Sequence, residues 1–85
     1  MSYKIYILYS DKFRKTYVGF SEAPIQRLES HNTGKVLSTK KYRPWRIVFE
    51  EEAKDYISAR KRELYYKSGA GRRKIKAIFD GLGIN

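Results

Sequence analysis

Residues 3–9 constrain the fold most, because the run Tyr-Lys-Ile-Tyr-Ile-Leu-Tyr is apolar or aromatic at nearly every position. Alternation along it places the odd-numbered residues on one face and the even-numbered residues on the other. We therefore predict a β-strand here. The polar loop 10–14 leads into residues 15–20, which predict a second strand, antiparallel to the first across this short connection. Gly19, near the end of that strand, indicates a bend or the close approach of another group.

A helix is predicted to follow directly, with Ser21 as its N-cap. It should run to about Asn32, where the pair Thr-Gly at 33–34 ends it. Residues 35–45 form a basic and aromatic connector, and Pro44 prevents a helix from passing through it.

The second half of the chain predicts one strand and two helices. The strand covers 46–51, a helix that Asp55 can cap covers 56–67, and a last helix covers 72–79 after the break Ser-Gly-Ala-Gly. Residues 81–85 are expected to form a loose tail. The order is therefore ββαβαα, which indicates a small α+β domain built on one sheet.

Composition narrows the chemistry that the chain can perform. Lys and Arg number 19 against 9 Asp and Glu, a net charge of +10, and so high a charge points to a polyanionic partner. Nucleic acid is the first candidate and an anionic membrane surface the second. The absence of Cys excludes disulfides and thiol catalysis, and a single His excludes a multi-histidine metal site. Any metal would therefore be a hard cation held by carboxylate and water.

The length of 85 residues allows one domain, which we take to span 1–85. No apolar run approaches the ~20 residues of a membrane span. The N-terminus lacks the apolar stretch of a signal peptide. We therefore expect a soluble, cytoplasmic protein without a membrane anchor.

Four side chains could serve phosphodiester hydrolysis, which needs a cation at the phosphate, a carboxylate for Mg²⁺ and a base for water. Tyr6 and Tyr17 lie on neighbouring predicted strands, so both hydroxyls could reach one pocket, or both rings could pack in the core. Arg27 fits a surface arginine with a packed stem as well as a phosphate ligand. Glu63 could equally form an ordinary i,i+4 pair with Lys67.

Two further features allow a functional and a structural interpretation. His31 could assist at such a site, but a lone histidine is more often a helix-surface residue. The connector 35–45 mixes charge with aromatic rings, as proteins that bind single strands do. It could equally be a solvated basic loop with Trp45 in the core.

The same residues resemble the pattern of the GIY-YIG nuclease family. Residues 4–6, Lys-Ile-Tyr, and 17–19, Tyr-Val-Gly, resemble the two halves of the family signature, with Lys in place of the first Gly and Val in place of the second Ile. Arg27 and Glu63 match the positions of the essential arginine and of the metal-ligand glutamate. The resemblance covers roughly residues 3–78. It is greatest with the small single-domain bacterial branch, similar to the N-terminal nuclease domain of the excinuclease C subunit.

This resemblance implies a three-stranded antiparallel sheet flanked by helices, and an endonuclease that hydrolyses phosphodiester bonds in DNA. It implies that Glu63 holds one Mg²⁺ or Mn²⁺ ion and that Arg27 neutralises the scissile phosphate. One of Tyr6 and Tyr17 takes a proton from the attacking water while the other orients it, with Tyr17 favoured as the base. His31 is a candidate second base or hydrogen-bond donor to the phosphate. The basic residues expected to hold the nucleic-acid backbone are Lys15, Lys40, Lys41, Arg43, Arg60, Arg62, Arg72 and Arg73.

Two alternatives stay open beside this interpretation. The chain could be a binding module that grips nucleic acid, or docks on a repair protein, without cutting; RNA is a second candidate ligand. It could also be a structural subunit of a larger complex, although that role would not need a charge of +10. An active enzyme would work in DNA repair or recombination, with a repair protein as a candidate partner.

Overall fold

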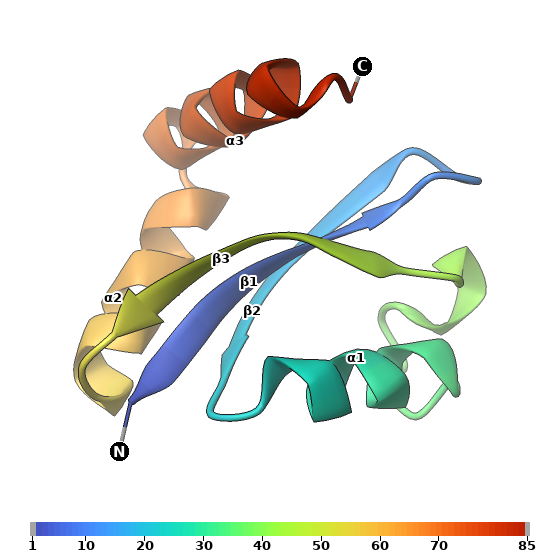
Figure 1. Cartoon of the computed structure of the whole chain (residues 1–85), viewed down its shortest axis with the longest axis horizontal. Helices are drawn as coiled ribbons and strands as arrows, with labels where there is room; N and C mark the ends of the chain where they lie inside the picture. The colour runs from blue at the N-terminus through green and yellow to red at the C-terminus, as the bar shows by residue number, and fades with distance from the viewer. Residues whose placement is uncertain (1, 85) are drawn as a thin grey trace.

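A computed structural model describes residues 2–84 and shows a three-stranded antiparallel sheet with three α-helices (Figure 1). The predicted α+β class and the order ββαβαα are confirmed. The strands pair in the order β2-β1-β3. The elements are β1 (Tyr3–Ser10), β2 (Lys15–Ser21), α1 (Pro24–Asn32), a 3₁₀ turn (Lys40–Tyr42), β3 (Arg46–Ala53), α2 (Tyr56–Lys67) and α3 (Gly69–Leu82).

Strand β1 is the central strand, and its two faces enter two different cores. Ile5 and Ile7 are fully buried in a cluster that also contains side chains of α2 and α3. Tyr6 and Leu8 are equally buried in a second cluster on the opposite face, with side chains of α1 and of the segment before β3. In Figure 1, α3 lies above the sheet and α1 below it. Both faces of β1 are therefore covered, as its unbroken apolar sequence requires.

Helix α1 begins later than predicted. Ser21 is the last residue of β2 and not the N-cap, and its Oγ accepts a hydrogen bond from Ala23 N at 2.9 Å in the following turn. Pro24 takes the first helical position, where its missing N–H is not needed. The predicted end at Asn32 is confirmed.

Helix α3 begins at Gly69, so its predicted start at Arg72 was wrong. Ser68 is its N-cap, because the Ser68 Oγ accepts a hydrogen bond from Gly71 N at 3.2 Å. Gly71 serves close packing between the helices, since a Cβ there would overlap the carbonyl oxygen of Tyr65. Gly69 and Gly71, which in the sequence indicated a break between two helices, thus lie where α2 and α3 pack together.

The C-terminal residues are more ordered than the loose tail predicted for 81–85. Gly81 and Leu82 are the last residues of α3. Gly83 follows in the left-handed conformation with φ 76°, and Ile84 N donates to the Phe79 carbonyl at 2.9 Å. This pattern is a helix-ending motif that satisfies the last carbonyl groups. Asn85 lies outside the described residues.

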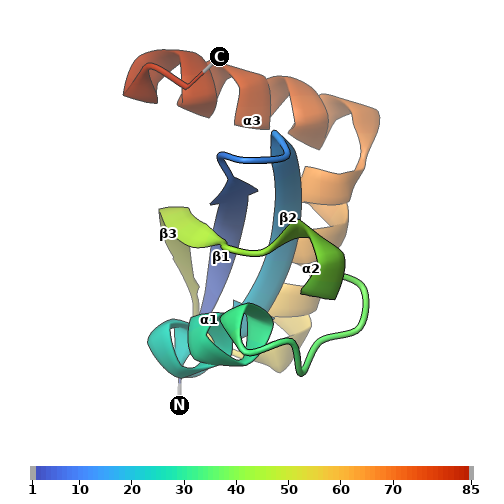
Figure 2. The ribbon, with the colours of Figure 1, turned by 90° about the vertical axis from the view of Figure 1, so that its right-hand side faces the viewer.

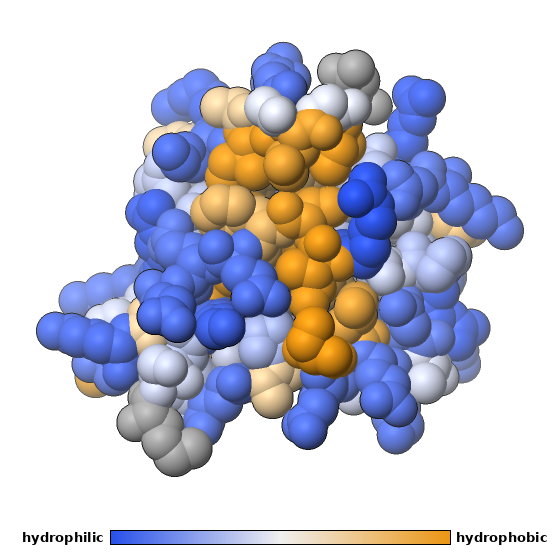
Figure 3. All heavy atoms as spheres, in the orientation of Figure 1, coloured by the Kyte–Doolittle hydropathy of each residue, from blue (hydrophilic) through white to orange (hydrophobic). Residues whose placement is uncertain are grey.

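One face of the protein carries an apolar area between charged side chains. On the face in Figure 3, apolar side chains run from α3 down across β3 and are bordered by hydrophilic side chains. Within residues 2–84, no helix is both long enough and apolar enough to cross a membrane.

Candidate active site

Tyr6 and Tyr17 lie on the same face of the sheet, on adjacent strands. Tyr6 pairs with Gly19 across β1 and β2, and Tyr17 pairs with Leu8, so the two phenols are diagonal neighbours. Gly19 makes room for both: a Cβ there would lie 2.7 Å from Tyr6 Oη and 3.1 Å from Tyr17 Cε2. The predicted close approach at Gly19 is therefore confirmed, and the group that approaches is the Tyr6 phenol.

His31 is fully buried and joins the tyrosines to the connector. Its Nδ1 lies 2.8 Å from Thr39 Oγ1, and Thr39 Oγ1 donates its own proton to the Val36 carbonyl at 3.3 Å. His31 Nδ1 must therefore carry a proton and donate it to Thr39. His31 Nε2 is then free to accept the proton of Tyr6 Oη, which lies 3.1 Å away. The chain of hydrogen bonds assigns one tautomer to His31 and one orientation to the Tyr6 hydroxyl.

Burial shapes the acidity of this pair. Loss of solvent lowers the pKa of His31 to about 4, and the nearby Arg27 charge acts in the same direction. Loss of solvent also raises the pKa of Tyr6 to about 12, an effect that Tyr17 and Glu63 increase and Arg27 opposes. At neutral pH, His31 is thus an uncharged acceptor and Tyr6 keeps its proton.

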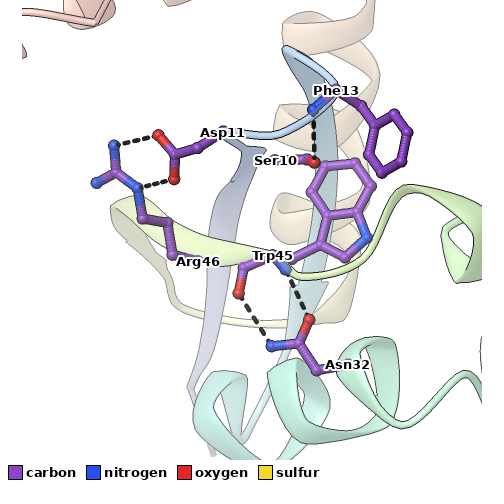
Figure 4. Close-up of polar contacts among 6 residues, drawn as sticks. All are labelled: Ser10, Asp11, Phe13, Asn32, Trp45 and Arg46. Atoms are coloured by element: carbon purple, nitrogen blue, oxygen red, sulfur yellow. Dashed lines mark hydrogen bonds and ion pairs between the residues drawn. The ribbon is translucent and has the colours of Figure 1, made fainter.

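A pair of hydrogen bonds fixes the end of α1 that carries His31. Figure 4 shows the side-chain amide of Asn32 facing the backbone of Trp45. Trp45 N donates to Asn32 Oδ1 at 2.6 Å, and Asn32 Nδ2 donates to the Trp45 carbonyl at 2.9 Å. The Trp45 indole N–H also donates to the Thr39 carbonyl at 3.0 Å. These contacts hold the connector, and with it the Thr39 hydroxyl, against His31.

Arg27 and Glu63 reach the tyrosines from different helices. Arg27 is an exposed residue of α1 whose guanidinium lowers the pKa of both Tyr6 and His31, while the Glu63 charge from α2 raises the pKa of Tyr6. Folding therefore brings Tyr17, Arg27 and Glu63 near Tyr6, and Arg27 near His31 as well. These residues are distant in the sequence and close in the fold.

Glu63 is buried and paired with two cations. Its Oε1 accepts from Arg60 Nη1 at 2.6 Å and its Oε2 from Lys67 Nζ at 2.9 Å. Burial acts to raise the pKa of the Glu63 carboxyl, but the hydrogen bonds from Lys67 and Arg60 outweigh it and lower the pKa. The ammonium of Lys67 also lies 6.0 Å from the centroid of the Tyr17 ring. Lys67 thus links the carboxylate to the exposed edge of the tyrosine pair.

Glu63 fits a hydrated divalent cation. The carboxylate is ionised, and each oxygen accepts one hydrogen bond and keeps a lone pair. Mg²⁺ commonly binds through one or two carboxylates and keeps several waters. Residues 2–84 contain no group of three or more His, Asp and Glu that could hold a metal ion, so an ion held by Glu63 would take most of its ligands from water and substrate.

The basic residues expected to bind a nucleic-acid backbone separate into three groups. Lys15 and Lys41 lie over the Tyr42 ring, each at 5.3 Å, and Arg43 donates from Nε to the neighbouring Lys40 carbonyl at 2.8 Å. These four form a basic patch around an aromatic ring. Arg72 and Arg73 are exposed in the first turn of α3, while Arg60 binds Glu63 as described.

Arg62 does not join these groups. Its guanidinium binds the Glu51 carboxylate on β3 and lies 4.5 Å from the Tyr65 ring centroid. Tyr66 Oη donates to the same carboxylate at 2.6 Å. The hydrogen bond from Arg62 to Glu51 raises the pKa of Arg62. Burial, and secondly the hydrogen bond from Tyr66 to Glu51, raise the pKa of Tyr66 to about 12. Arg62 therefore joins α2 to β3 and has little freedom to contact a phosphate.

Three residues that matter here were not singled out as site residues by the sequence analysis. Thr39 and Asn32 gave no signal, because a polar residue in a connector or at a helix end carries no mark of its partner. Lys67 was noted only as an i,i+4 partner of Glu63. That pair forms, and the structure adds the approach of Lys67 to Tyr17.

Comparison with known proteins places this arrangement in context. Residues 2–76 match a protein-family model described as the GIY-YIG catalytic domain. Comparison with curated proteins gives no match. The solution NMR structure of a UPF0213 protein from Bacillus halodurans is similar, with a TM-score of 0.54 and 25% identity, over 92% of this chain and 83% of that chain. The two chains share their arrangement of helices and strands over most of their length.

Proposed function

Because the chain belongs to the GIY-YIG family, we propose that it is a divalent-metal-dependent endonuclease that hydrolyses phosphodiester bonds in DNA. The observation that carries this proposal is that Tyr17, Arg27 and Glu63, from a second strand and two helices, all lie near enough to Tyr6 to act on its pKa. Attack of water on a phosphodiester builds negative charge on the phosphate and releases a proton. The cluster offers a cation that can neutralise the charge on the phosphate and phenolic oxygens that can accept the proton. The setting we propose is DNA repair or recombination.

Each side chain has a distinct role in the proposed reaction. Arg27, exposed at the surface, neutralises the scissile phosphate as charge builds on it. Tyr17, half-buried beside the Lys67 ammonium, acts as a phenolate that accepts the proton of the attacking water and becomes a neutral phenol. Tyr6 has committed its own proton to His31, so its oxygen presents lone pairs that orient the water. Water forms the new P–O bond, and the bond to the leaving oxygen breaks.

Glu63 would hold the Mg²⁺ or Mn²⁺ ion, which when bound supplies positive charge at the phosphate and at the departing oxygen. Hydrogen bonds from Lys67 and Arg60 keep the buried carboxylate ionised and in one orientation. The net charge of +10 supports a polyanionic substrate. The patch around Tyr42 and the exposed arginines of α3 provide contacts that tolerate any sequence.

One observation favours a second candidate, a nucleic-acid-binding module that does not cut. Both oxygens of Glu63 are already bound by cations, an arrangement that would also suit a purely structural carboxylate. In that case the basic surface would bind nucleic acid, or the module would dock on a repair protein. The two candidates differ in one measurable property, which is cleavage.

A nicking assay separates them. We expect the parent protein to nick a labelled DNA carrying a single-stranded flap in Mg²⁺ or Mn²⁺, and to lose this activity in EDTA. Arg27→Ala and Glu63→Gln should abolish nicking while circular dichroism and DNA binding stay close to those of the parent. Glu52→Gln, which changes an exposed carboxylate on β3, is the matched control and should nick normally.

The outcomes decide between the candidates. If the parent binds DNA with a steep dependence on salt and cuts none of a panel of flapped, single-stranded and duplex DNA or RNA, the binding module is correct. If Arg27→Ala and Glu63→Gln nick as fast as the parent, the protein is a nuclease whose catalytic residues lie elsewhere.

A further inference from the structure

A groove borders the tyrosine pair on the outer side of β2. Residues 16–18 of β2 form one wall, and Tyr66 and Ile75 form the floor between α2 and α3. Lys67 and Arg72 stand at its rim, and its volume is about 400 Å³. Figure 2 shows β2 lying beside α2, with α3 crossing the hairpin end of the sheet. Tyr17 belongs both to this groove and to the candidate active site.

The lining of the groove suits a nucleotide. Its floor is apolar and firmly packed, since Val18, Tyr66 and Ile75 are 6%, 1% and 9% exposed. Its rim is cationic: the Lys67 side chain is 46% exposed, and no carboxylate within residues 2–84 pairs with the guanidinium of Arg72. A base stacks on apolar or aromatic side chains while its phosphate meets Lys or Arg. The groove therefore offers an apolar surface and a cationic rim, and both lie in the same hollow as Tyr17.

The size of the groove restricts what can enter. Ligand pockets usually measure about 300–1,000 Å³, and this groove lies near the lower limit, which suits one nucleotide rather than a paired helix. A second hollow of about 420 Å³ continues it along α3, shares Thr16, Arg72 and Ile75, and reaches Lys76 and Phe79. The path leads away from Tyr17 past Arg72 to Lys76, which forms an ion pair with Asp80 of the same hollow, and the direction along α3 suits a single strand.

From these observations we propose that the groove binds one unstacked base of a DNA strand, next to the phosphate held at the tyrosine pair. The preferred substrate then has at least one unpaired nucleotide beside the cut, as in a flap, fork or gap, and is not a continuous duplex. This inference rests on the proposed endonuclease function for the identity of the neighbouring phosphate. Charge favours DNA over a protein segment as the occupant, because a chain of net charge +10 attracts a polyanion.

A base-scanning experiment tests the inference without cleavage. A flapped duplex carries 2-aminopurine at each successive position across the junction, and binding is followed in EDTA. We expect the fluorescence to change at one unpaired position on binding. Replacing that base with an abasic residue should weaken binding about 5- to 100-fold, the loss expected for one stacked base. An abasic residue elsewhere in the flap should have little effect.

Matched variants locate the effect. Thr16→Glu adds bulk and negative charge at the shared wall of both hollows, and Arg72→Gln removes the cation at the rim. Both should erase the preference for flapped over continuous duplex. Ile57→Glu adds the same charge at an exposed position of α2 that lines neither hollow, and Lys54→Gln removes an exposed cation beyond β3. Both controls should keep the preference.

The outcomes distinguish this inference from the proposed function. If the parent nicks DNA but the base scan is flat, or Thr16→Glu keeps the preference, the groove proposal is wrong and the nuclease stands. If one base responds but no DNA is cut in Mg²⁺ or Mn²⁺, the groove proposal stands and hydrolysis is wrong. If flapped, single-stranded and continuous duplex DNA bind equally, a protein segment becomes the better occupant and the inference is overturned.

Discussion

Replacing Gly19 with alanine should damage the tyrosine pair far more than one added methyl group suggests. The new Cβ would lie 2.7 Å from Tyr6 Oη and 2.8 Å from Tyr6 Cζ. Ordinary contact begins at 3.4 Å, so the phenol would have to retreat by about 0.7 Å. Tyr6 is 1% exposed, and its packed neighbours oppose that movement. The hydrogen bond to His31, 3.1 Å long, would move with the phenol.

The expected magnitudes follow from this geometry. Overpacking a buried site lowers the unfolding free energy by about 1–3 kcal/mol. Displacing a reacting group by ~1 Å can cost ~10²-fold in rate, so we expect Gly19→Ala to nick DNA about 10²-fold more slowly. DNA binding should change little, because the basic residues that meet the backbone are untouched.

Urea unfolding and nicking measure both effects. Trp45 is the single tryptophan and is 5% exposed, so its fluorescence reports unfolding. Gly81→Ala is the matched control, because a Cβ there meets no atom within 4 Å; it should raise the unfolding free energy by roughly 0.5–1 kcal/mol and leave nicking unchanged. If Gly19→Ala matches the parent in both stability and nicking, the phenol does not depend on the space that Gly19 leaves.

Three further predictions concern stability and use the same urea assay. Gly71→Ala should lower the unfolding free energy by about 3 kcal/mol or more, since its Cβ overlaps the Tyr65 carbonyl and backbone cannot turn aside; a stability equal to the parent's would contradict the helix contact. Asp55→Ala should cost about 1 kcal/mol, because the Asp55 carboxylate caps α2 through Ser58 N at 2.8 Å; no loss would mean that the cap contributes nothing. The pKa of His31 falls from 6.5 to about 4 on folding, so the unfolded state binds the extra proton and stability should fall, by at most about 3 kcal/mol, as the pH is lowered from 6.5 to 4. His31→Asn should flatten that slope above about pH 5.5, whereas the paired carboxylates Glu51 and Glu63, whose pKa values folding lowers from 4.5, keep the slope nearer pH 4. A parent with no slope between about pH 6.5 and 5.5 would refute the buried neutral imidazole.

The sequence predicted the elements well wherever local pattern determines them. The apolar alternation of residues 3–9 corresponds to β1, and the helix predicted at 56–67 matches α2. Its errors fall where a distant contact decides the outcome. Ser21 has the chemistry of a helix N-cap but pairs with Lys4 in the sheet. Gly71 lies within α3 and does not break it; the absence of a side chain at Gly71 lets α3 pack closely against α2.

The candidate site shows the same division. Spacing and family pattern pointed to Tyr6, Tyr17, Arg27 and Glu63, and their common location is a product of the fold. The partner of His31 could not be predicted, since Thr39 lies in an irregular connector whose path is set by Trp45 and Asn32. Nor could the sequence show that Arg62 faces Glu51 on β3, because helix phase alone does not say which strand a side chain meets.

Strand β2 ties the proposed chemistry and the proposed base groove into one arrangement. Side chains alternate along a strand, so Tyr17 faces His31 on one side of the sheet while Thr16 and Val18 face Ile75 on the other. The register with β1 fixes this division, because Tyr6 must pair with Gly19 for both phenols to fit. A slip of one residue would turn Tyr17 away from His31 and Val18 toward it. The pairing that positions the proposed reacting phenol therefore also sets its distance from the proposed base groove, and neither can be moved without the other.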